Sequence, residues 1–301
     1  MTADARLEEA LQAAGDVRRD EPLSRHTTFG IGGPADLFVT VRTVDGLSLA
    51  TKLTRETQTP TFVLGSGSNI LVADAGIRGV VIDNRARDED SDGRRFRVGS
   101  GTSFAGFARK MCRLGLDGLT WAVGIPGTLG GAVVYNAGAY GGSLGDVLTR
   151  VRLQDAEGDR WIDAAELGLV YRGSVFTRGQ FVDKTVLETE VELRDGSAAE
   201  LLARAAAHDG KRLTAQPRGR NAGSMFKNPT ERPAWKLIED VGLRGAQQGD
   251  AAISEKHCNF FVNYGNARAA DVAALVHEAE RRVGEQFGIT LEREVAFVGA
   301  W

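Results

Sequence analysis

Two glycine-rich segments contain the residue types that could bind a phosphate group. Backbone N–H groups converge on a phosphate only where no side chain blocks the approach, so glycine and small hydroxyl residues are typical of such loops. The first segment follows an apolar run and consists of Gly65, Ser66, Gly67, Ser68 and Asn69. Ile70 stands where a Rossmann fingerprint has its last glycine, and the loop lacks the lysine of a Walker A motif. The pentapeptide alone fits a tight turn as well as a phosphate loop.

The second segment, Gly124–Gly142, is longer and richer in small residues than a simple connection needs. Long loops inside a compact domain are usually functional or disordered, and apolar residues such as Leu129 and Val133 argue against disorder. Two phosphate-binding loops in one domain predict a dinucleotide ligand. The candidate contacts in this segment are Gly124, Ile125, Pro126, Gly127, Gly130, Gly131, Asn136, Ala137 and Gly138.

Four motifs along the chain resemble those of the UDP-N-acetylenolpyruvoylglucosamine reductases. They are His26–Ala35, the loop at Gly65, the segment Gly124–Gly142 and the motif Asn221–Pro229. The resemblance extends from about Leu23 to Gly299 and keeps the order of the motifs. It implies an FAD-binding domain of the vanillyl-alcohol-oxidase and p-cresol-methylhydroxylase (PCMH) type, NADPH as the reductant, and UDP-N-acetylglucosamine enolpyruvate as the substrate.

The chain differs in two ways from some relatives in this group of flavoproteins. Some relatives in the flavin superfamily attach FAD through a histidine in the first loop, but Ser68 and Asn69 stand here instead. We therefore expect FAD to bind non-covalently. The chain is also shorter than family members with an extra tyrosine-bearing loop over the substrate, so it resembles the shorter, second subtype.

Three residues match the family's catalytic positions. Reducing an enol ether requires a hydride at one alkene carbon and a proton at its neighbour. The resemblance implies that Ser224 donates the proton, that Arg172 holds the enolpyruvyl carboxylate, and that Glu294 assists near the start of the last strand. A guanidinium suits the second role because it offers paired donors and keeps its charge. Without the family, these residues would be a loop serine, a surface cation and a strand carboxylate, and Glu292 shares the strand parity of Glu294.

The substrate also carries a diphosphate and sugars, for which basic and amide side chains are suitable. Lys227 and Asn228 follow Ser224 closely and are candidate contacts to these groups. A basic loop from Lys211 to Arg220 precedes the motif, and within it Arg218 and Arg220 are candidate ligands of the diphosphate. Such a cluster is otherwise a solvated loop.

Apolar periodicity predicts the elements that carry these motifs, and their order indicates an α+β fold. Helices are expected at about residues 7–14, 47–53, 104–114, 198–207, 235–240 and 272–287. Strands are expected at about 37–42, 61–64, 79–83, 95–99, 151–155, 185–193, 259–263 and 289–298. The strands 151–155 and 185–193 have the alternation of antiparallel strands with one solvent-exposed face. We expect an FAD-binding PCMH-type region over 1–195, with its core at about 29–194, and a smaller α+β substrate-binding domain over 196–301.

Composition narrows the functional classes. The 301 residues carry a formal net charge of −3, which gives no reason to expect nucleic acid as a partner. Neither a signal peptide nor an apolar run of about 18 residues is evident, so we expect a cytoplasmic protein without membrane insertion. Cys112 and Cys258 lie far apart without metal-ligand spacing, and no metal is expected. Oligomeric state is not encoded in these features, and a monomer is the favoured expectation.

Two rival functions fit parts of the pattern. Another flavin oxidoreductase of the PCMH type, such as a sugar-lactone oxidase, would need the FAD loops but not Ser224. A non-catalytic FAD- or nucleotide-binding module would keep the loops and turn nothing over, but Arg172, Ser224 and Glu294 together argue against it.

Overall fold

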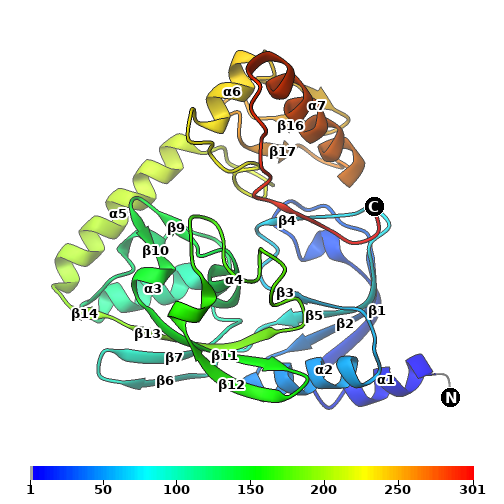
Figure 1. Ribbon diagram of the computed structural model, residues 1–301, viewed down its shortest axis with the longest axis vertical. Helices are drawn as coiled ribbons and strands as arrows, with labels where there is room; N and C mark the ends of the chain where they lie inside the picture. Colours follow the sequence, from blue (N-terminus) through cyan, green and yellow to red (C-terminus); the bar gives the residue numbers. More distant parts are fainter. Residues whose placement is uncertain (1–2) are drawn as a thin grey trace. The chain divides into compact units, whose positions relative to one another are not determined.

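The computed structural model describes residues 3–301 and has an α+β fold, as predicted (Figure 1). The helices are α1 Ala3–Leu11, α2 Val44–Glu56, α3 Phe104–Arg113, α4 Leu129–Val134, α5 Ala198–Ala215, α6 Ala234–Asp240 and α7 Ala269–Phe287. The first strands are β1 Asp16–Pro22, β2 Pro34–Val41, β3 Thr61–Leu64, β4 Ile70–Val72, β5 Ile77–Asn84, β6 Glu89–Asp92, β7 Arg95–Gly99, β8 Leu116–Asp117 and β9 Gly138–Ala139. The remaining strands are β10 Gly142–Ser143, β11 Leu148–Asp155, β12 Gly158–Asp163, β13 Thr185–Glu192, β14 Arg194–Asp195, β15 Gln247–Gln248, β16 Ala251–Ile253, β17 Phe261–Asn263 and β18 Ala296–Val298.

The chain divides into two compact units. The first unit contains the chain through Arg19, Leu37–Gly65 and Gly79–Lys211. The second unit contains Asp20–Asp36, Ser66–Arg78 and the chain from Arg212. These units are defined by backbone contacts, and the expected functional domains 1–195 and 196–301 stay a prediction.

Two sheets form the framework of the first unit. A four-stranded sheet has the order β1-β2-β5-β3, and helices α1 and α2 pack on it through a core that includes Leu11, Leu47 and Val39. The five-stranded sheet has the order β12-β11-β13-β7-β6 and is antiparallel throughout. Helices α3 and α4 share a second core with this sheet, which includes Phe107 and Leu129. The first glycine loop begins directly after β3, and the second glycine segment contains α4, which packs in the second core.

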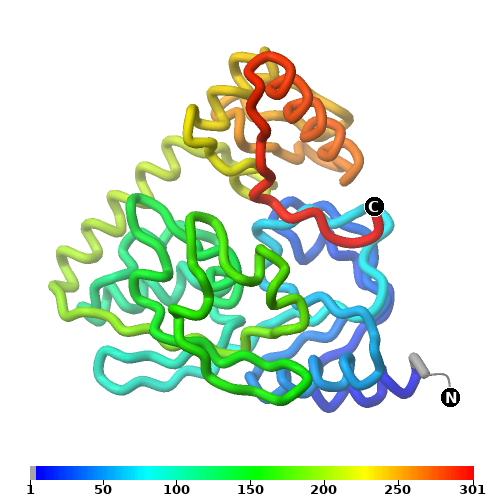
Figure 2. Tube along the Cα trace, viewed as in Figure 1, coloured from blue at the N-terminus to red at the C-terminus, as the bar shows by residue number. Residues whose placement is uncertain are grey.

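The second unit is built around the long helix α7. The apolar stripe predicted for residues 272–287 is buried, and the helix ends where Gly288 adopts a left-handed conformation with φ +66°. Helix α6 and the sheet β15-β16-β17 share this core. Strand β18 pairs in parallel with β4, so the C-terminal strand lies beside a segment more than 200 residues earlier, as Figure 2 shows.

Several expected elements differ in extent from the structure. Strand β1 was not predicted, and helix α5 continues to Ala215, so Lys211 and Arg212 lie on a helix instead of in the expected basic loop. The expected strand 289–298 is wrong over most of its length, because only Ala296–Val298 forms a strand. Glu292 and Glu294 therefore do not lie on a strand, so the expectation that their side chains share one face of it does not apply.

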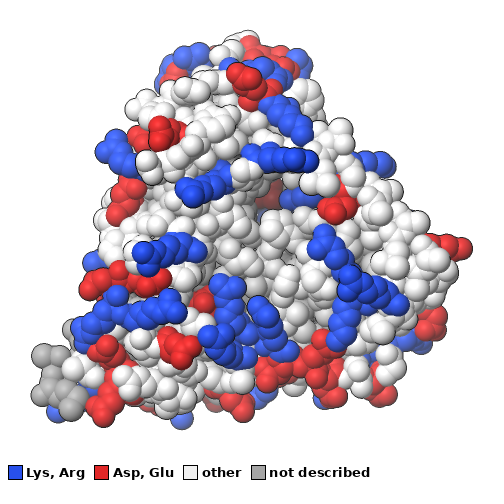
Figure 3. Space-filling model, turned by 180° about the vertical axis from the view of Figure 1, so that it is seen from behind, with Lys and Arg blue, Asp and Glu red and all other residues white. Residues whose placement is uncertain are grey.

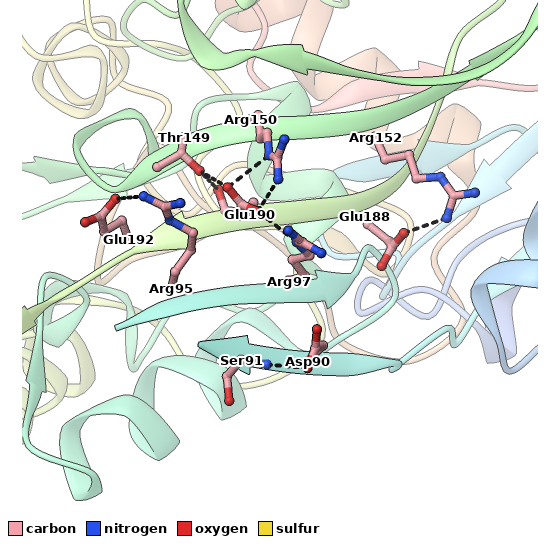
Figure 4. A network of polar contacts seen from close by, with 10 residues as sticks. All are labelled: Asp90, Ser91, Arg95, Arg97, Thr149, Arg150, Arg152, Glu188, Glu190 and Glu192. Carbon is pink, nitrogen blue, oxygen red and sulfur yellow. Dashed lines mark hydrogen bonds and ion pairs between the residues drawn. The ribbon is translucent and has the colours of Figure 1, made fainter. Parts of the chain in front are cut away.

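The antiparallel pairing of 151–155 with 185–193 is confirmed, but the exposed face is only partly so. Glu190 on β13 is 2% exposed because arginines on the two neighbouring strands cover it (Figure 4). Its carboxylate accepts hydrogen bonds from Arg97 Nε at 2.9 Å and from Arg150 Nη2 at 2.8 Å. The guanidinium of Arg150 lies 4.8 Å from the ring centre of Trp161. This charged cluster covers a face of the sheet that the sequence pattern predicts to be exposed to solvent.

Candidate functional site

The first glycine loop adjoins the second glycine segment within the first unit. A Cβ atom on Gly65 would lie 2.7 Å from Oγ1 of Thr128, which begins helix α4 as its N-cap. A Cβ on Gly130 would lie 3.0 Å from Cβ of Ser100, whose carbonyl accepts a 2.8 Å hydrogen bond from the Gly130 amide. A side chain at either position would therefore force its neighbour to move. The two segments predicted to bind a dinucleotide meet at this point.

The rest of the first loop lies in the second unit and contacts the His26–Ala35 motif. Gly67 has φ +60°, and a Cβ there would lie 2.2 Å from the carbonyl oxygen of His26. The Thr28 amide donates a 3.0 Å hydrogen bond to the Gly67 carbonyl, and the Thr28 hydroxyl donates one of 2.7 Å to the carbonyl of Asn221. Because Asn221 begins the Ser224 motif, three of the four sequence motifs meet here.

Ser224 lies on a short stretch of extended backbone that Asn259 holds from one side. Ser224 forms an isolated antiparallel bridge with Phe260. The Asn259 side chain accepts a 2.9 Å hydrogen bond from the Phe226 amide and donates one of 2.7 Å to the Phe226 carbonyl. The Asn259 carbonyl also accepts a 2.7 Å hydrogen bond from the Met225 amide. The serine is partly exposed, and Met225 and Phe226, which follow it, are buried.

Glu294 reaches the same stretch from the opposite side. Its amide donates a 2.8 Å hydrogen bond to the Met225 carbonyl, and its own carbonyl accepts one of 3.0 Å from Nδ2 of Asn69. The Ala296 amide donates to the Asn69 carbonyl at 3.0 Å. The structure thus brings the backbones of Glu294, Ser224 and the first glycine loop together within the second unit.

The other residues predicted to bind substrate already have protein partners. Lys227 forms an ion pair with Glu292, so the residue that competed with Glu294 in the sequence has a partner of its own. The side-chain oxygen of Asn228 accepts a 3.1 Å hydrogen bond from the amide of Ala234 at the start of α6. These contacts leave the expected roles in substrate binding as predictions.

The two candidate arginines of the basic loop are both exposed and differ in their surroundings. Arg220 donates a 3.2 Å hydrogen bond from Nη1 to the Gly265 carbonyl, and its Cδ occupies the space that a Cβ on Gly30 would need. Its backbone pairs with Asn263. Arg218 is exposed at the loop surface. Arg220 is therefore the more firmly placed of the two.

Arg172 lies in the first unit, on a turn against the Gly124–Gly142 segment. Its Nη1 donates a 2.9 Å hydrogen bond to the Gly138 carbonyl. The Ser174 hydroxyl, on the same turn, donates one of 2.6 Å to the Val134 carbonyl. The guanidinium also lies 5.2 Å from the ring centre of Tyr171, which is 58% exposed. The residue expected to hold a carboxylate is thus attached to the segment expected to bind the dinucleotide.

Comparisons with known proteins agree with the four motifs. The model of the FAD-binding domain matches residues 35–162, and that of the C-terminal domain of UDP-N-acetylenolpyruvoylglucosamine reductase matches residues 214–298. The reductase of Clostridioides difficile is 40% identical over 289 residues, with 94% of each chain covered. The chain belongs to the UDP-N-acetylenolpyruvoylglucosamine reductase family. The family relative of Desulfosudis oleivorans is 43% identical over 297 residues, covering 94% of this chain and 95% of the relative.

A solved structure supports the same assignment at the level of the fold. The crystal structure of UDP-N-acetylenolpyruvylglucosamine reductase (MurB) from Thermus caldophilus matches with a TM-score of 0.80 and 38% sequence identity. The match covers 94% of this chain and 98% of that one. The predicted family and the FAD-binding PCMH-type fold with a second α+β part are both confirmed.

The reductase family uses FAD and NADPH, and the chain is an FAD-dependent oxidoreductase. Each glycine segment, taken by itself, has features that fit this cofactor. Ser66 and Ser68 are partly exposed beside Gly67, where close approach leaves no room for a side chain, and the residues from Gly124 to Gly127 are partly or fully exposed. When bound, FAD would supply the redox chemistry of an oxidoreductase.

Two cysteines and two histidines pack or pair within the protein. Burial raises the pKa of the thiols of Cys112 and Cys258, both of which are buried. Burial lowers the pKa of His257. His26 pairs with Glu21 at 2.8 Å.

Three further observations concern the surface, the helices and the potential metal ligands of this reductase. Lysines and arginines are interspersed with carboxylates over the face seen in Figure 3, in keeping with the formal net charge of −3. Within residues 3–301, none of the helices combines the length and the apolar character required to cross a bilayer. Likewise, the described residues contain no cluster of three potential metal-binding side chains.

Two asparagines make long-range contacts near the candidate residues. Asn259, which sequence reasoning did not single out, holds the Ser224 stretch, and Asn136, predicted as a cofactor contact, has a side-chain amide that donates to the Val170 carbonyl of the Arg172 turn. Neither has a local signal, because each acts on a backbone group more than 30 residues away.

Proposed function

We propose that the chain reduces UDP-N-acetylglucosamine enolpyruvate to UDP-N-acetylmuramate, with NADPH as the reductant of bound FAD. The supporting observation is a match of about 40% identity over nearly the full length of relatives named for this reductase activity. The arrangement of Ser224, Glu294 and the first glycine loop in the second unit agrees with it. An oxidase that lacks a need for Ser224 would not require this arrangement.

Three side chains perform the proposed chemistry. The Ser224 hydroxyl donates a proton to the alkene carbon next to the one that receives the hydride. The Arg172 guanidinium holds the enolpyruvyl carboxylate as enolate charge develops, because its paired donors stay charged. Glu294 assists the proton transfer from beside the Ser224 stretch, to which its backbone is bonded.

The proposed binding residues fall into two groups, those for FAD and those for the substrate. Proposed FAD contacts are Gly65, Ser66, Gly67, Ser68, Asn69, Gly124, Ile125, Pro126, Gly127, Gly130, Gly131, Ala137 and Gly138, with the cofactor held non-covalently. Proposed contacts to the diphosphate and sugar are Lys227, Asn228, Arg218 and Arg220. We place FAD binding in residues 1–195 and substrate binding in 196–301, and propose a cytoplasmic protein that acts as a monomer.

The test separates the two half-reactions. The purified protein is loaded with FAD, reduced anaerobically with NADPH, and mixed with UDP-N-acetylglucosamine enolpyruvate without oxygen. Rapid flavin reoxidation with formation of the lactyl ether is expected. In Ser224→Ala this reoxidation should be lost while reduction by NADPH continues. A reduced flavin that ignores the substrate and reacts only with oxygen would contradict the proposal and favour an oxidase.

A further inference from the structure

The turn that carries Arg172 has a backbone conformation that needs support. Arg172 has φ +52°, in the left-handed region that residues with a Cβ rarely adopt. Such a conformation persists only where the surrounding structure holds it. Val170 and Gly173 close the turn, each donating its amide to the other's carbonyl, at 3.0 and 3.2 Å. These two bonds shape the turn but do not attach it to the rest of the first unit.

The side chain of Asn136 supplies an attachment. Its Nδ2 donates a 3.0 Å hydrogen bond to the Val170 carbonyl, and its Oδ1 accepts one of 3.0 Å from the Gly145 amide. Asn136 itself has φ +41° and is 8% exposed. Asparagine is among the few residues other than glycine that tolerate this conformation. Its backbone amide is bonded to the Val133 carbonyl at 3.2 Å, so the residue is fixed at the end of α4.

We propose that Asn136 is a positioning residue for Arg172 and not a direct contact of the flavin. The amide fixes the Val170 carbonyl, the turn holds φ at Arg172, and the guanidinium is thereby kept at the Gly138 carbonyl 2.9 Å away. The segment that borders the cofactor thus sets the place of the group that holds the substrate carboxylate. The inference rests on the role proposed for Arg172.

Two substitutions of Asn136 distinguish the effect of its side-chain hydrogen-bond donor from the effect of its left-handed backbone conformation. Asn136→Asp keeps the size and the acceptor for Gly145 but removes the donor and places a carboxylate oxygen against the Val170 carbonyl. Asn136→Gly removes the whole amide and keeps the left-handed conformation without strain. A matched control is Gln154→Glu, because Gln154 is also a buried amide of the first unit, 6% exposed, and donates to Ser48 Oγ at 2.7 Å.

The measurements use FAD-loaded full-length protein. Reduction of the flavin by NADPH and its reoxidation by UDP-N-acetylglucosamine enolpyruvate are followed separately, and amide hydrogen exchange is followed over residues 170–173. Loss of the hydrogen bond that fixes the Val170 carbonyl should slow reoxidation about tenfold in both Asn136 variants. Exchange at the turn should rise, while FAD content and reduction by NADPH change less than about twofold. Gln154→Glu should lower stability without either effect on the turn.

A double variant distinguishes positioning from an independent role. If Asn136 acts through the arginine, Asn136→Asp should slow reoxidation no further when Arg172 is already alanine. Equal slowing in both backgrounds would overturn the inference, as would loss of FAD with unchanged exchange at the turn. Unchanged reoxidation in Arg172→Ala would instead remove the proposed role of Arg172, and with it this inference.

Discussion

The backbone amide of Glu294 donates a 2.8 Å hydrogen bond to the carbonyl of Met225, the residue that follows Ser224. Asn259 holds the same stretch from the other side through Phe226. The candidate proton donor is therefore placed by two segments that lie 35 or more residues further along the chain. Its position depends on folding of the second unit and not on local sequence.

Replacing Asn259 should disturb Ser224 without touching it. In Asn259→Ala, the Phe226 amide and carbonyl lose their partners in a site that is 2% exposed. Leaving such buried groups unsatisfied costs about 1 to 3 kcal/mol each, so urea unfolding should show a loss of about 2 to 6 kcal/mol for the two groups together. Flavin reoxidation by the substrate should slow more than reduction by NADPH. If both half-reactions keep their rates in the folded variant, Asn259 has no part in placing Ser224.

Gly67→Ala should prevent FAD from binding. The added Cβ would meet the His26 carbonyl at 2.2 Å, so the loop and the first motif must separate. Gly93→Ala is the matched control, because Gly93 has φ +62° against +60° for Gly67 but open space around it. Both changes carry the conformational cost of about 1 kcal/mol that a left-handed alanine brings. Visible absorbance of the purified proteins should show bound flavin in Gly93→Ala and little in Gly67→Ala.

Acid should weaken the first unit through Glu190. Burial raises the pKa of this carboxyl group, but hydrogen bonds from Arg150 and Arg97 outweigh it and lower the pKa from 4.5 to about 2. A lowered pKa means that the folded chain gains stability above the ordinary value and loses it as pH falls through 4.5 towards 2. At roughly 1.4 kcal/mol for each pKa unit, the contribution at pH 7 is about 3 kcal/mol.

The variant Glu190→Gln tests this contribution. Its free energy of unfolding should be lower than that of the unchanged protein by about 3 kcal/mol at pH 7, and the difference should shrink as the pH approaches about 2. Glu192→Gln is the control, since Glu192 pairs with Arg95 at the exposed end of the same strand. An exposed pair of this kind contributes about 0 to 1 kcal/mol. Equal pH dependence in the two variants would show that the buried cluster is not responsible.

The local sequence pattern predicts the strands of this fold better than it predicts which residues they contact. Strands Thr61–Leu64 and Arg95–Gly99 have the predicted bounds, because alternation and the flanking glycines are properties of the segment itself. The expected strand at 289–298 is mostly absent, because the backbone at Glu294 bonds to Met225 instead of to a sheet. The burial of Glu190 depends on arginines from two other strands, which no window of sequence contains.

The site was predictable only where a motif identifies it. Ser224 and Glu294 came from the family resemblance, and the structure brings their backbones together. The role of Asn136 was not predictable, since its partner Val170 lies 34 residues away on a turn with no regular pattern. Hydrogen bonds between residues far apart in the sequence produce no pattern in residue spacing, so the sequence alone does not predict them.

The ion pair between Lys227 and Glu292 offers a test of substrate binding that does not depend on stability. Glu292 has a side chain that is 70% exposed, so losing the pair should change the free energy of unfolding by no more than about 1 kcal/mol. If Lys227 binds the diphosphate, Lys227→Met should raise the dissociation constant of UDP-N-acetylmuramate about tenfold, the effect of a lost charge-assisted hydrogen bond. Glu292→Gln should lower that constant, because the lysine no longer has a competing carboxylate. Titration of the oxidised flavin spectrum at low and high salt measures both, and an unchanged affinity in Lys227→Met would leave the pair as a surface contact only.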